Sequence, residues 1–118
     1  NTSEDGGGID GESGVTLTGS TISDNSTAGD YADGGGLHSW SAVTLTGSTV
    51  SNNTTSGYGA DGGGISGDSV TLTGSTVSSN TINADGVTGG GISGGLVSLI
   101  NSTVSGNSAD GGVDKADE

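Results

Sequence analysis

The sequence contains few residues that could carry out acid–base chemistry. Asp10 and Glu12 are a close pair of carboxylates. They lie in a segment expected to be a short turn, where carboxylates are usually solvated surface charges. His38 is the single histidine, and its sequence neighbours offer no partner for general acid–base catalysis. Because the one basic residue is Lys115, near the end of the sequence, we expect no catalytic residues, no cofactor-binding residues and no enzymatic activity.

Three aspartates are candidates for binding a cation. Asp5, Asp33 and Asp61 each stand directly before a run of three glycines. At equivalent positions of stacked repeats they would form a column of carboxylates. Like charges ~5 Å apart repel one another unless a cation or salt intervenes. Carboxylate oxygens are ligands that calcium prefers, so the column predicts a calcium or other cation site, with screened surface charges as the alternative.

Threonines recur at alternate positions of the presumed strands. In a strand, alternate residues share one face, so they would form a grid on a flat outer surface. Such grids resemble the ice-binding faces of β-solenoid antifreeze proteins, although threonine is also favoured on any strand surface. The grid consists of the columns Thr16/Thr44/Thr71, Thr18/Thr46/Thr73 and Thr21/Thr49/Thr76/Thr103.

Asparagines suggest two different roles. One set recurs at a single position of the repeat, where side-chain amides can hydrogen-bond from coil to coil as an asparagine ladder: Asn25, Asn53, Asn80 and Asn107. A second set begins Asn-x-Ser/Thr sequons, the acceptor motif for N-glycosylation: Asn1, Asn25, Asn52, Asn53 and Asn101. Since Asn25 and Asn53 belong to both sets, Asn52 and Asn101 are the better glycosylation candidates.

The aromatic residues are candidates for stacking against sugars. Trp40, Tyr31 and Tyr58 are the only aromatic side chains of the sequence, and all three fall in expected turns. An exposed aromatic ring with a polar edge suits a sugar face. Packing within the turns is the alternative role.

A repeat of about 28 residues spaces all these side chains. The segment VTLTGSTVSNN, from Val43 to Asn53, has close copies beginning at Val15 and Val70 and a degraded copy at Val97. A triple glycine and an aliphatic residue precede each copy, and the triplets start 28, 28 and 27 residues apart. A fixed period of this length is typical of a solenoid.

The pattern within each repeat predicts β-structure. In VTLT the valine and leucine share one face and the threonines the other, while glycines and β-branched residues exclude an α-solenoid. We predict an all-β, single-domain parallel β-helix of about four coils with three short strands each. The segments 26–33, 54–61 and 81–88 vary and are expected to be turns, and the glycine triplets to be corners without room for a Cβ or with positive φ. The predicted inward residues are Ile9, Val15, Leu17, Ile22, Leu37, Val43, Leu45, Val50, Ile65, Val70, Leu72, Val77, Ile92, Val97, Leu99 and Val104.

Composition restricts the classes of partner. Fourteen acidic residues against one basic residue give a net charge of −13. Nucleic acid binding depends on Lys and Arg, so it is excluded, and no apolar run is long enough to insert into a membrane. Abundant aspartate and scarce lysine resemble proteins of salt-loving organisms, with an ordinary acidic secreted protein as the alternative.

The repeat also carries a family resemblance. A Gly-Gly-small-aliphatic motif followed by aromatic-x-x-Asn is the repeat of polymorphic outer-membrane proteins, an adhesive β-helical surface family. This chain resembles it in its GGGI/L motifs and in ISDN, VSNN, VSSN and VSGN, which end at the four ladder asparagines. It differs by having Ile or Val where that family often has Phe. More broadly, the chain is similar to the right-handed parallel β-helices of large secreted and cell-surface proteins.

These observations define the expected organisation and role. We expect β-helix repeats over residues 1–109, with coils at about 5–32, 33–60, 61–87 and 88–109, and an acidic tail, cap or linker at 110–118. The resemblance implies a structural or adhesive extracellular module of a surface fibre, filament or adhesin. Expected partners are neighbouring repeats, further copies stacked end to end, or surface glycans. The alternatives are a solenoid that binds ice, glycan or calcium, and a fragment of a polysaccharide-active β-helix enzyme.

Overall fold

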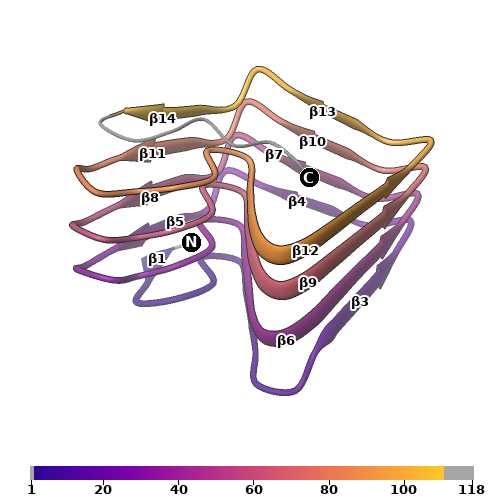
Figure 1. Cartoon of the computed structure of the whole chain (residues 1–118), viewed down its shortest axis with the longest axis horizontal. Helices are drawn as coiled ribbons and strands as arrows, with labels where there is room; N and C mark the ends of the chain where they lie inside the picture. The colour runs from indigo at the N-terminus through magenta and orange to yellow at the C-terminus, as the bar shows by residue number, and fades with distance from the viewer. Residues whose placement is uncertain (1, 111–118) are drawn as a thin grey trace.

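The described residues form a stack of coils built from strands. The computed structural model describes residues 2–110. Each coil adds one level to three parallel sheets, and the levels lie above one another in register (Figure 1). The predicted all-β solenoid of about four coils with three strands per coil is confirmed.

The three sheets follow one another around each coil. The long-strand sheet contains β2 (Ile9–Gly11), β3 (Val15–Thr18), β6 (Leu37–Thr46), β9 (Ile65–Thr73) and β12 (Ile92–Ile100). The middle sheet contains β4 (Thr21–Ser23), β7 (Thr49–Ser51), β10 (Thr76–Ser78) and β13 (Thr103–Ser105). The loop-side sheet contains β1 (Thr2–Ser3), β5 (Ser26–Ala28), β8 (Thr54–Ser56), β11 (Thr81–Asn83) and β14 (Ser108–Asp110).

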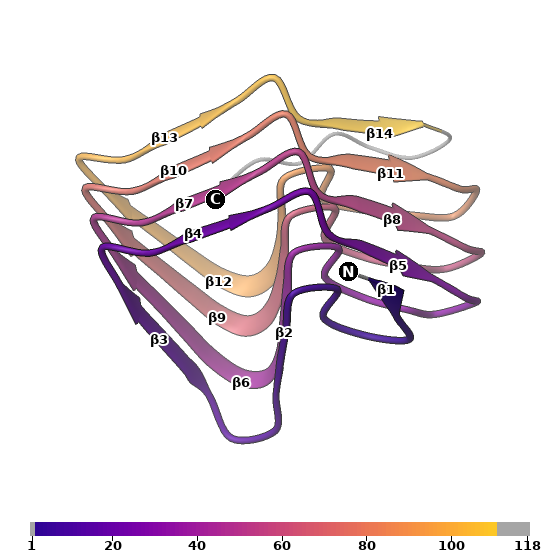
Figure 2. The ribbon, with the colours of Figure 1, turned by 180° about the vertical axis from the view of Figure 1, so that it is seen from behind.

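The long strands join two parts of the repeat that the first coil keeps apart. β6, β9 and β12 run without interruption from the first aliphatic residue through the VTLT segment, and they bend strongly between the two (Figure 2). A register shift between Ser39 and Ala42 marks the bend. In the first coil a turn separates β2 from β3, and Gly14 has a φ of 139° there. The predicted short turn therefore exists in the first coil, whereas the later coils replace it with a bend within one strand.

All sixteen predicted inward side chains lie in or against one core. Eleven are buried; the other five, Ile9, Val15, Leu17, Leu99 and Val104, are partly buried and belong to the first and last coils. A side chain in a middle coil is covered from both sides, whereas one in an end coil has a neighbour on one side only. The core is therefore a set of aliphatic columns whose ends are less buried than their middles.

The segments predicted as variable turns begin with strands, which corrects the sequence prediction. Their first three residues form β5, β8 and β11 of the loop-side sheet. The central side chains Thr27, Thr55 and Ile82 are fully buried. This inward-facing column was not predicted because two of its three side chains are threonines, and the pattern of apolar residues predicts only columns of apolar side chains.

The asparagine ladder is confirmed. The backbone N–H of Asn53 donates to Oδ1 of Asn80 at 3.0 Å, and Nδ2 of Asn53 donates to the same oxygen at 2.9 Å. The Asn53 Nδ2 also donates to the carbonyl of Ile22 at 3.2 Å. Asn25 and Asn107 extend the pattern by one coil on either side. The left-handed residue of this corner precedes the ladder position, as at Asn52 with a φ of 56°.

Each of the three positions in the glycine triplets requires glycine for a different structural reason. The first glycines have φ between 52° and 69°, as at Gly6 and Gly62, where a side chain is strained. A Cβ on the second, such as Gly35, would lie 2.4 Å from the carbonyl oxygen of Gly63 in the next coil. A Cβ on the third, such as Gly64, would lie 2.8 Å from Cγ of Asn80. The triplet and the asparagine, 16 to 19 residues apart in the sequence, are therefore parts of one packed corner.

Candidate functional site

Exposed aromatic side chains mark the loops beside the loop-side sheet. The Tyr31 and Tyr58 rings lie edge to face, with centroids 6.0 Å apart. Both side chains are mostly exposed. The backbone N–H of Tyr31 donates to the carbonyl of Tyr58 at 2.8 Å, and the N–H of Tyr58 donates to Oδ1 of Asp30 at 3.1 Å. A Cβ on Gly59 would lie 2.7 Å from the Tyr31 ring, so a glycine in the next coil makes room for this tyrosine.

The third predicted stacking residue belongs to a different contact. Trp40 is exposed on β6 and lies edge to face with the His38 ring, at a centroid distance of 4.9 Å. Of the three predicted stacking residues, the structure brings Tyr31 and Tyr58 into contact and gives Trp40 a different neighbour. We call Tyr31 and Tyr58 the tyrosine pair.

An open depression lies beside Tyr31, one member of the tyrosine pair. It has a volume of about 380 Å³ and is lined by residues 28–32 together with Glu4 and Asp5. Asp30 and Glu4 are exposed carboxylates, and Tyr31 supplies an aromatic surface. This combination offers a ring for stacking and acceptors for hydroxyl or ammonium groups.

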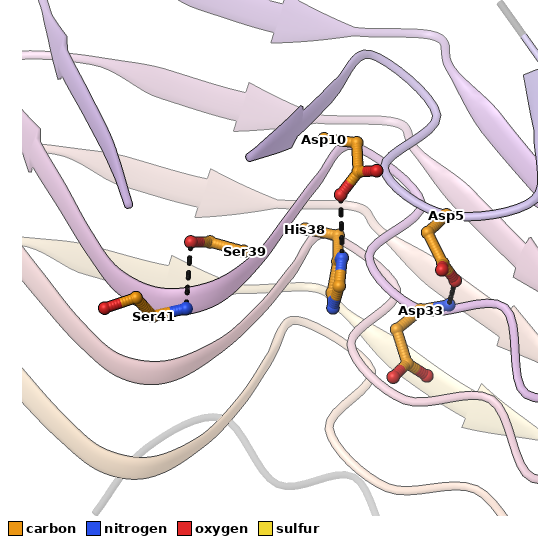
Figure 3. Close-up of polar contacts among 6 residues, drawn as sticks. All are labelled: Asp5, Asp10, Asp33, His38, Ser39 and Ser41. Carbon is orange, nitrogen blue, oxygen red and sulfur yellow. Dashed lines mark hydrogen bonds and ion pairs between the residues drawn. The ribbon is translucent and has the colours of Figure 1, made fainter. Parts of the chain in front are cut away.

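His38 has a partner that the local sequence did not reveal. Its Nδ1 lies 2.9 Å from Oδ1 of Asp10, which occupies the same repeat position one coil earlier (Figure 3). His38 is buried, with 3% of its surface exposed, whereas Asp10 is exposed. Aligning the repeats places Asp10 opposite His38, so a comparison 28 residues apart would have found the pair. The expectation that His38 has no partner is wrong.

The predicted aspartate column exists, but it is a hydrogen-bonded ladder. Oδ1 of Asp5 accepts the backbone N–H of Asp33 at 2.9 Å, and Oδ1 of Asp33 accepts that of Asp61 at 2.7 Å (Figure 3 shows the first of these bonds). Asp61 ends the column by accepting the N–H and the hydroxyl of Thr88 at 3.0 and 2.6 Å. Each carboxylate therefore fixes the loop of the following coil.

The electrostatics of this column are least favourable at its middle member. Burial raises the pKa of the Asp33 carboxyl, and repulsion from Asp61 and Asp5 raises it further. The hydrogen bond from the Asp61 backbone and the charge of His38 lower the Asp33 pKa in part. Within residues 2–110, no group of three or more His, Cys, Asp or Glu side chains is placed to hold a metal ion. The predicted shared calcium site is corrected accordingly: the carboxylates lie one per coil and use their oxygens on the backbone.

Comparison with known proteins gives the family. Residues 1–116 match the family model described as "Right handed beta helix region", which covers nearly all of the chain and agrees with the stacked parallel sheets. The chain belongs to the right-handed beta-helix family. No curated protein and no solved structure matched the chain.

The threonine grid of this right-handed beta-helix is in register. Thr16, Thr44 and Thr71 are direct neighbours on adjacent strands. Thr18, Thr46 and Thr73 form the parallel column, and β12 follows with Ser98 and Ile100. The third column, on the middle sheet, lies past the Gly-Ser corner. The grid therefore consists of two short columns on one arm of the long-strand sheet.

The sequons of the beta-helix separate into two groups. Asn53 is fully buried, Asn25 is half-buried, and both direct their amides into the ladder. Asn52 and Asn101 are exposed at corners. Asn1 lies outside the described residues, as do Lys115 and the predicted acidic tail apart from Asp110, which ends β14.

A serine ladder is the element that sequence reasoning missed. The N–H of Ser48 donates to Oγ of Ser75 at 3.1 Å, and that hydroxyl donates to the Thr73 carbonyl at 3.0 Å. Ser20 and Ser102 extend the column at either end. The signal was present as a serine at one fixed position of every repeat.

Within the described range, no helix is long and apolar enough to cross a membrane.

Proposed function

We propose that this right-handed beta-helix is a non-catalytic structural and adhesive module of an extracellular fibre, stalk or adhesin. The observation that carries the proposal is the uniformity of the molecule. Three in-register sheets and three side-chain ladders repeat with little change through the described residues. A solenoid of this kind provides length and a regular surface, and its stability accumulates from contacts between neighbouring coils.

The finer assignment is to the adhesive repeat of polymorphic outer-membrane proteins. It is supported by the coupling of the two halves of the repeat motif, since the third glycine of the triplet leaves room for the ladder asparagine, as at Gly36 and Asn53. The aliphatic residue that replaces Phe, as at Val50 and Val77, is fully buried. A smaller side chain therefore serves the same inward position.

The adhesive contact is proposed at the tyrosine pair and its depression, with surface glycans as the partner. Exposed aromatic rings stack on sugar faces, and the neighbouring carboxylates accept sugar hydroxyl groups. Tyr31→Ala is expected to abolish retention of the protein on immobilised glycans, whereas Trp40→Ala, an exposed aromatic with another neighbour, leaves it unchanged. Equal loss in both variants would contradict this placement.

Self-association along the axis is the second proposed partnership. Among residues 2–110, β12, β13 and β14 pair with a neighbouring strand on one side only, and free strand edges recruit further strands. Neighbouring coils of a longer chain or a second copy would satisfy them.

A polysaccharide-active enzyme is the competing function, and the Asp10–His38 pair is the observation that favours it. A carboxylate on Nδ1 orients an imidazole for acid–base work. Incubation with a panel of polysaccharides, followed by an assay for new reducing ends and unsaturated products, tests it. Turnover that disappears in His38→Gln would establish the enzyme and end the non-catalytic proposal.

The location and form of the native protein test the main proposal. Immunogold labelling of intact source cells should mark extended fibres outside the cell, and antibody fragments against the tyrosine pair should block attachment. Label confined to the cell interior would contradict the proposal.

A further inference from the structure

Every coil has two corners whose geometry is the same from level to level. At the first, between the long-strand and middle sheets, Gly19, Gly47 and Gly74 have φ of 56–57°, and a Cβ on any of them would meet nothing within 4 Å. In the fourth coil this position is Asn101, with a φ of 48°, and it is exposed. A side chain here therefore projects into open solvent.

The second corner lies between the middle and loop-side sheets. Its left-handed residues are Asp24, Asn52, Ser79 and Gly106, with φ from 56° to 62°. Asn52 is exposed, and the next residue, Asn53, faces inward into the ladder. Side chains on the two sides of this peptide bond thus have opposite surroundings.

Both corners carry a hydroxyl residue two positions later. Thr103 begins β13 after Asn101, and Thr54 begins β8 after Asn52. The same place is held by Ser or Thr in all four coils, because each corner leads into a strand that begins with one of these residues. Any asparagine at the left-handed position therefore completes an Asn-x-Ser/Thr sequon.

The asparagine ladder makes the other two described sequons, at Asn25 and Asn53, unsuitable for attachment of a sugar. Attachment of a sugar requires a free Nδ2, but Nδ2 of Asn53 donates to the Ile22 carbonyl and to Oδ1 of Asn80. Nδ2 of Asn25 donates to Oδ1 of Asn53 at 3.2 Å. A glycan on either would break the corner that the asparagine holds.

We propose that Asn52 and Asn101 are N-glycosylation sites and that the left-handed corners are a periodic set of positions for displaying glycans. The co-substrate is a sugar activated as a diphosphate ester. The asparagine Nδ2 forms a bond to C1 of the sugar, the C1–O bond to the diphosphate breaks, the diphosphate leaves with the electron pair, and the amide loses one proton. The inference rests on the proposed extracellular function only in that the chain must meet a glycosyltransferase.

Left-handed backbone alone also favours asparagine, so the test must separate backbone preference from modification. The folded protein is treated with an N-glycosyltransferase that uses nucleotide-activated glucose, with a sequon peptide as the activity control. In a chain carrying Asn1→Gln, which removes the sequon outside the described residues, we expect the intact mass to rise by two hexoses, located at Asn52 and Asn101 by peptide fragmentation. Asn52→Gln and Asn101→Gln should each remove one hexose. No hexose on the folded chain, or hexose on Asn25 or Asn53, would overturn the inference.

Variants that gain a site provide the sharper control. Gly74→Asn and Ser79→Asn each create a sequon at an equivalent corner, and each should add one hexose. Ile82→Thr also creates a sequon, at Asn80, but this asparagine is in the ladder, so it should add none while the chain stays folded.

Native material completes the test. Peptides from the protein isolated from its source should carry glycans at Asn52 and Asn101, and unmodified peptides at both would overturn the inference. A chain found on the cell surface without glycans fails this inference alone, whereas a chain found inside the cell fails the proposed function.

Discussion

In two columns of this beta-helix, a side-chain oxygen accepts a backbone N–H from a neighbouring coil, but the side chains differ and the bonds run in opposite directions along the axis. In the asparagine ladder, the N–H of Asn53 reaches forward to the side chain of Asn80 in the next coil. In the aspartate ladder, the N–H of Asp61 reaches back to the side chain of Asp33 in the previous coil. Both satisfy a backbone donor at a corner, and both recur once per coil.

The two ladders differ in the charge of their side chains and in whether those side chains can donate hydrogen bonds. An asparagine amide is neutral and donates as well as accepts, so Asn53 and Asn80 can be fully buried with their polar atoms satisfied. An ionised aspartate only accepts, and its neighbours in the column repel it. We therefore expect the asparagine ladder to stabilise the core and the aspartate ladder to make the stability of the loops depend on salt and pH.

Removing one asparagine should have the largest effect. Asn80→Ala deprives the N–H of Asn53 and the carbonyl of Val50 of their partners in a buried place. Each unsatisfied buried group costs about 1–3 kcal/mol, so we expect a loss of about 4 kcal/mol in the free energy of unfolding, measured by urea titration. Asn83→Ala, at an exposed asparagine on β11, is the control. Equal effects of the two variants would contradict a stabilising ladder.

Filling the space beside the ladder should be the next most damaging change. A Cβ on Gly64 would lie 2.7 Å from the Gly91 carbonyl oxygen and 2.8 Å from Nδ2 of Asn80. Overpacking of this kind costs about 1–3 kcal/mol, so Gly64→Ala should lower the urea midpoint. Gly95→Ala, where the nearest atom is the Asp68 carbonyl at 3.1 Å, should lower it less. Indistinguishable midpoints would mean that the triplet and the asparagine are independent.

The serine ladder should contribute less than the asparagine ladder. Ser75→Ala removes an acceptor for the Ser48 N–H and a donor to the Thr73 carbonyl. We expect a loss of about 1–2 kcal/mol, measured as above, with Ser78→Ala on the outer face of β10 as control. A loss as large as that of Asn80→Ala would show that the two ladders are equivalent.

A substitution in the aspartate ladder should raise the free energy of unfolding instead of lowering it, and the change should be the smallest of the four. Because the pKa of Asp33 is raised in the folded state, its ionised form opposes folding at neutral pH. Asp33→Asn keeps an acceptor for Asp61, so it should be slightly more stable than the parent chain at pH 7 and low salt. The advantage should shrink as the pH falls through the folded pKa of Asp33, and as NaCl is added. An advantage that is independent of pH would contradict the electrostatic explanation.

The sequence predicted the parts of this molecule that depend on the repeat. The columns through Leu45 and Leu72 and the ladder through Asn53 and Asn80 follow from register alone, because a parallel solenoid places equivalent residues above one another. What it did not predict depends on contacts across coils between unlike residues, such as Asp10 with His38. The column containing Thr55 was missed for another reason: a buried threonine has no apolar signature.

The candidate site was predictable only as a list of residues. The repeat places Tyr31 opposite Gly59 and Tyr58 opposite Asp30 in neighbouring coils, so the sequence brings the two tyrosines near each other but does not predict the contact of their rings. The depression beside them depends on the path of residues 28–32, which no periodic pattern describes. The aspartates were placed correctly in a column, but their hydrogen bonds to the next backbone depend on loop geometry that the sequence does not encode as a motif.

The most direct test exchanges the two side-chain types between the ladders. Asn80→Asp places a carboxylate in a fully buried position facing the Val50 carbonyl and Asn107 Oδ1, which it cannot satisfy. The free energy of unfolding of Asn80→Asp and of Asp33→Asn should be measured side by side at pH 7 and low salt. We predict a loss of more than about 3 kcal/mol for Asn80→Asp, partly recovered on acidification, and no loss for Asp33→Asn. Losses of similar size in both variants would contradict the distinction between a stabilising amide ladder and a sensitive carboxylate ladder.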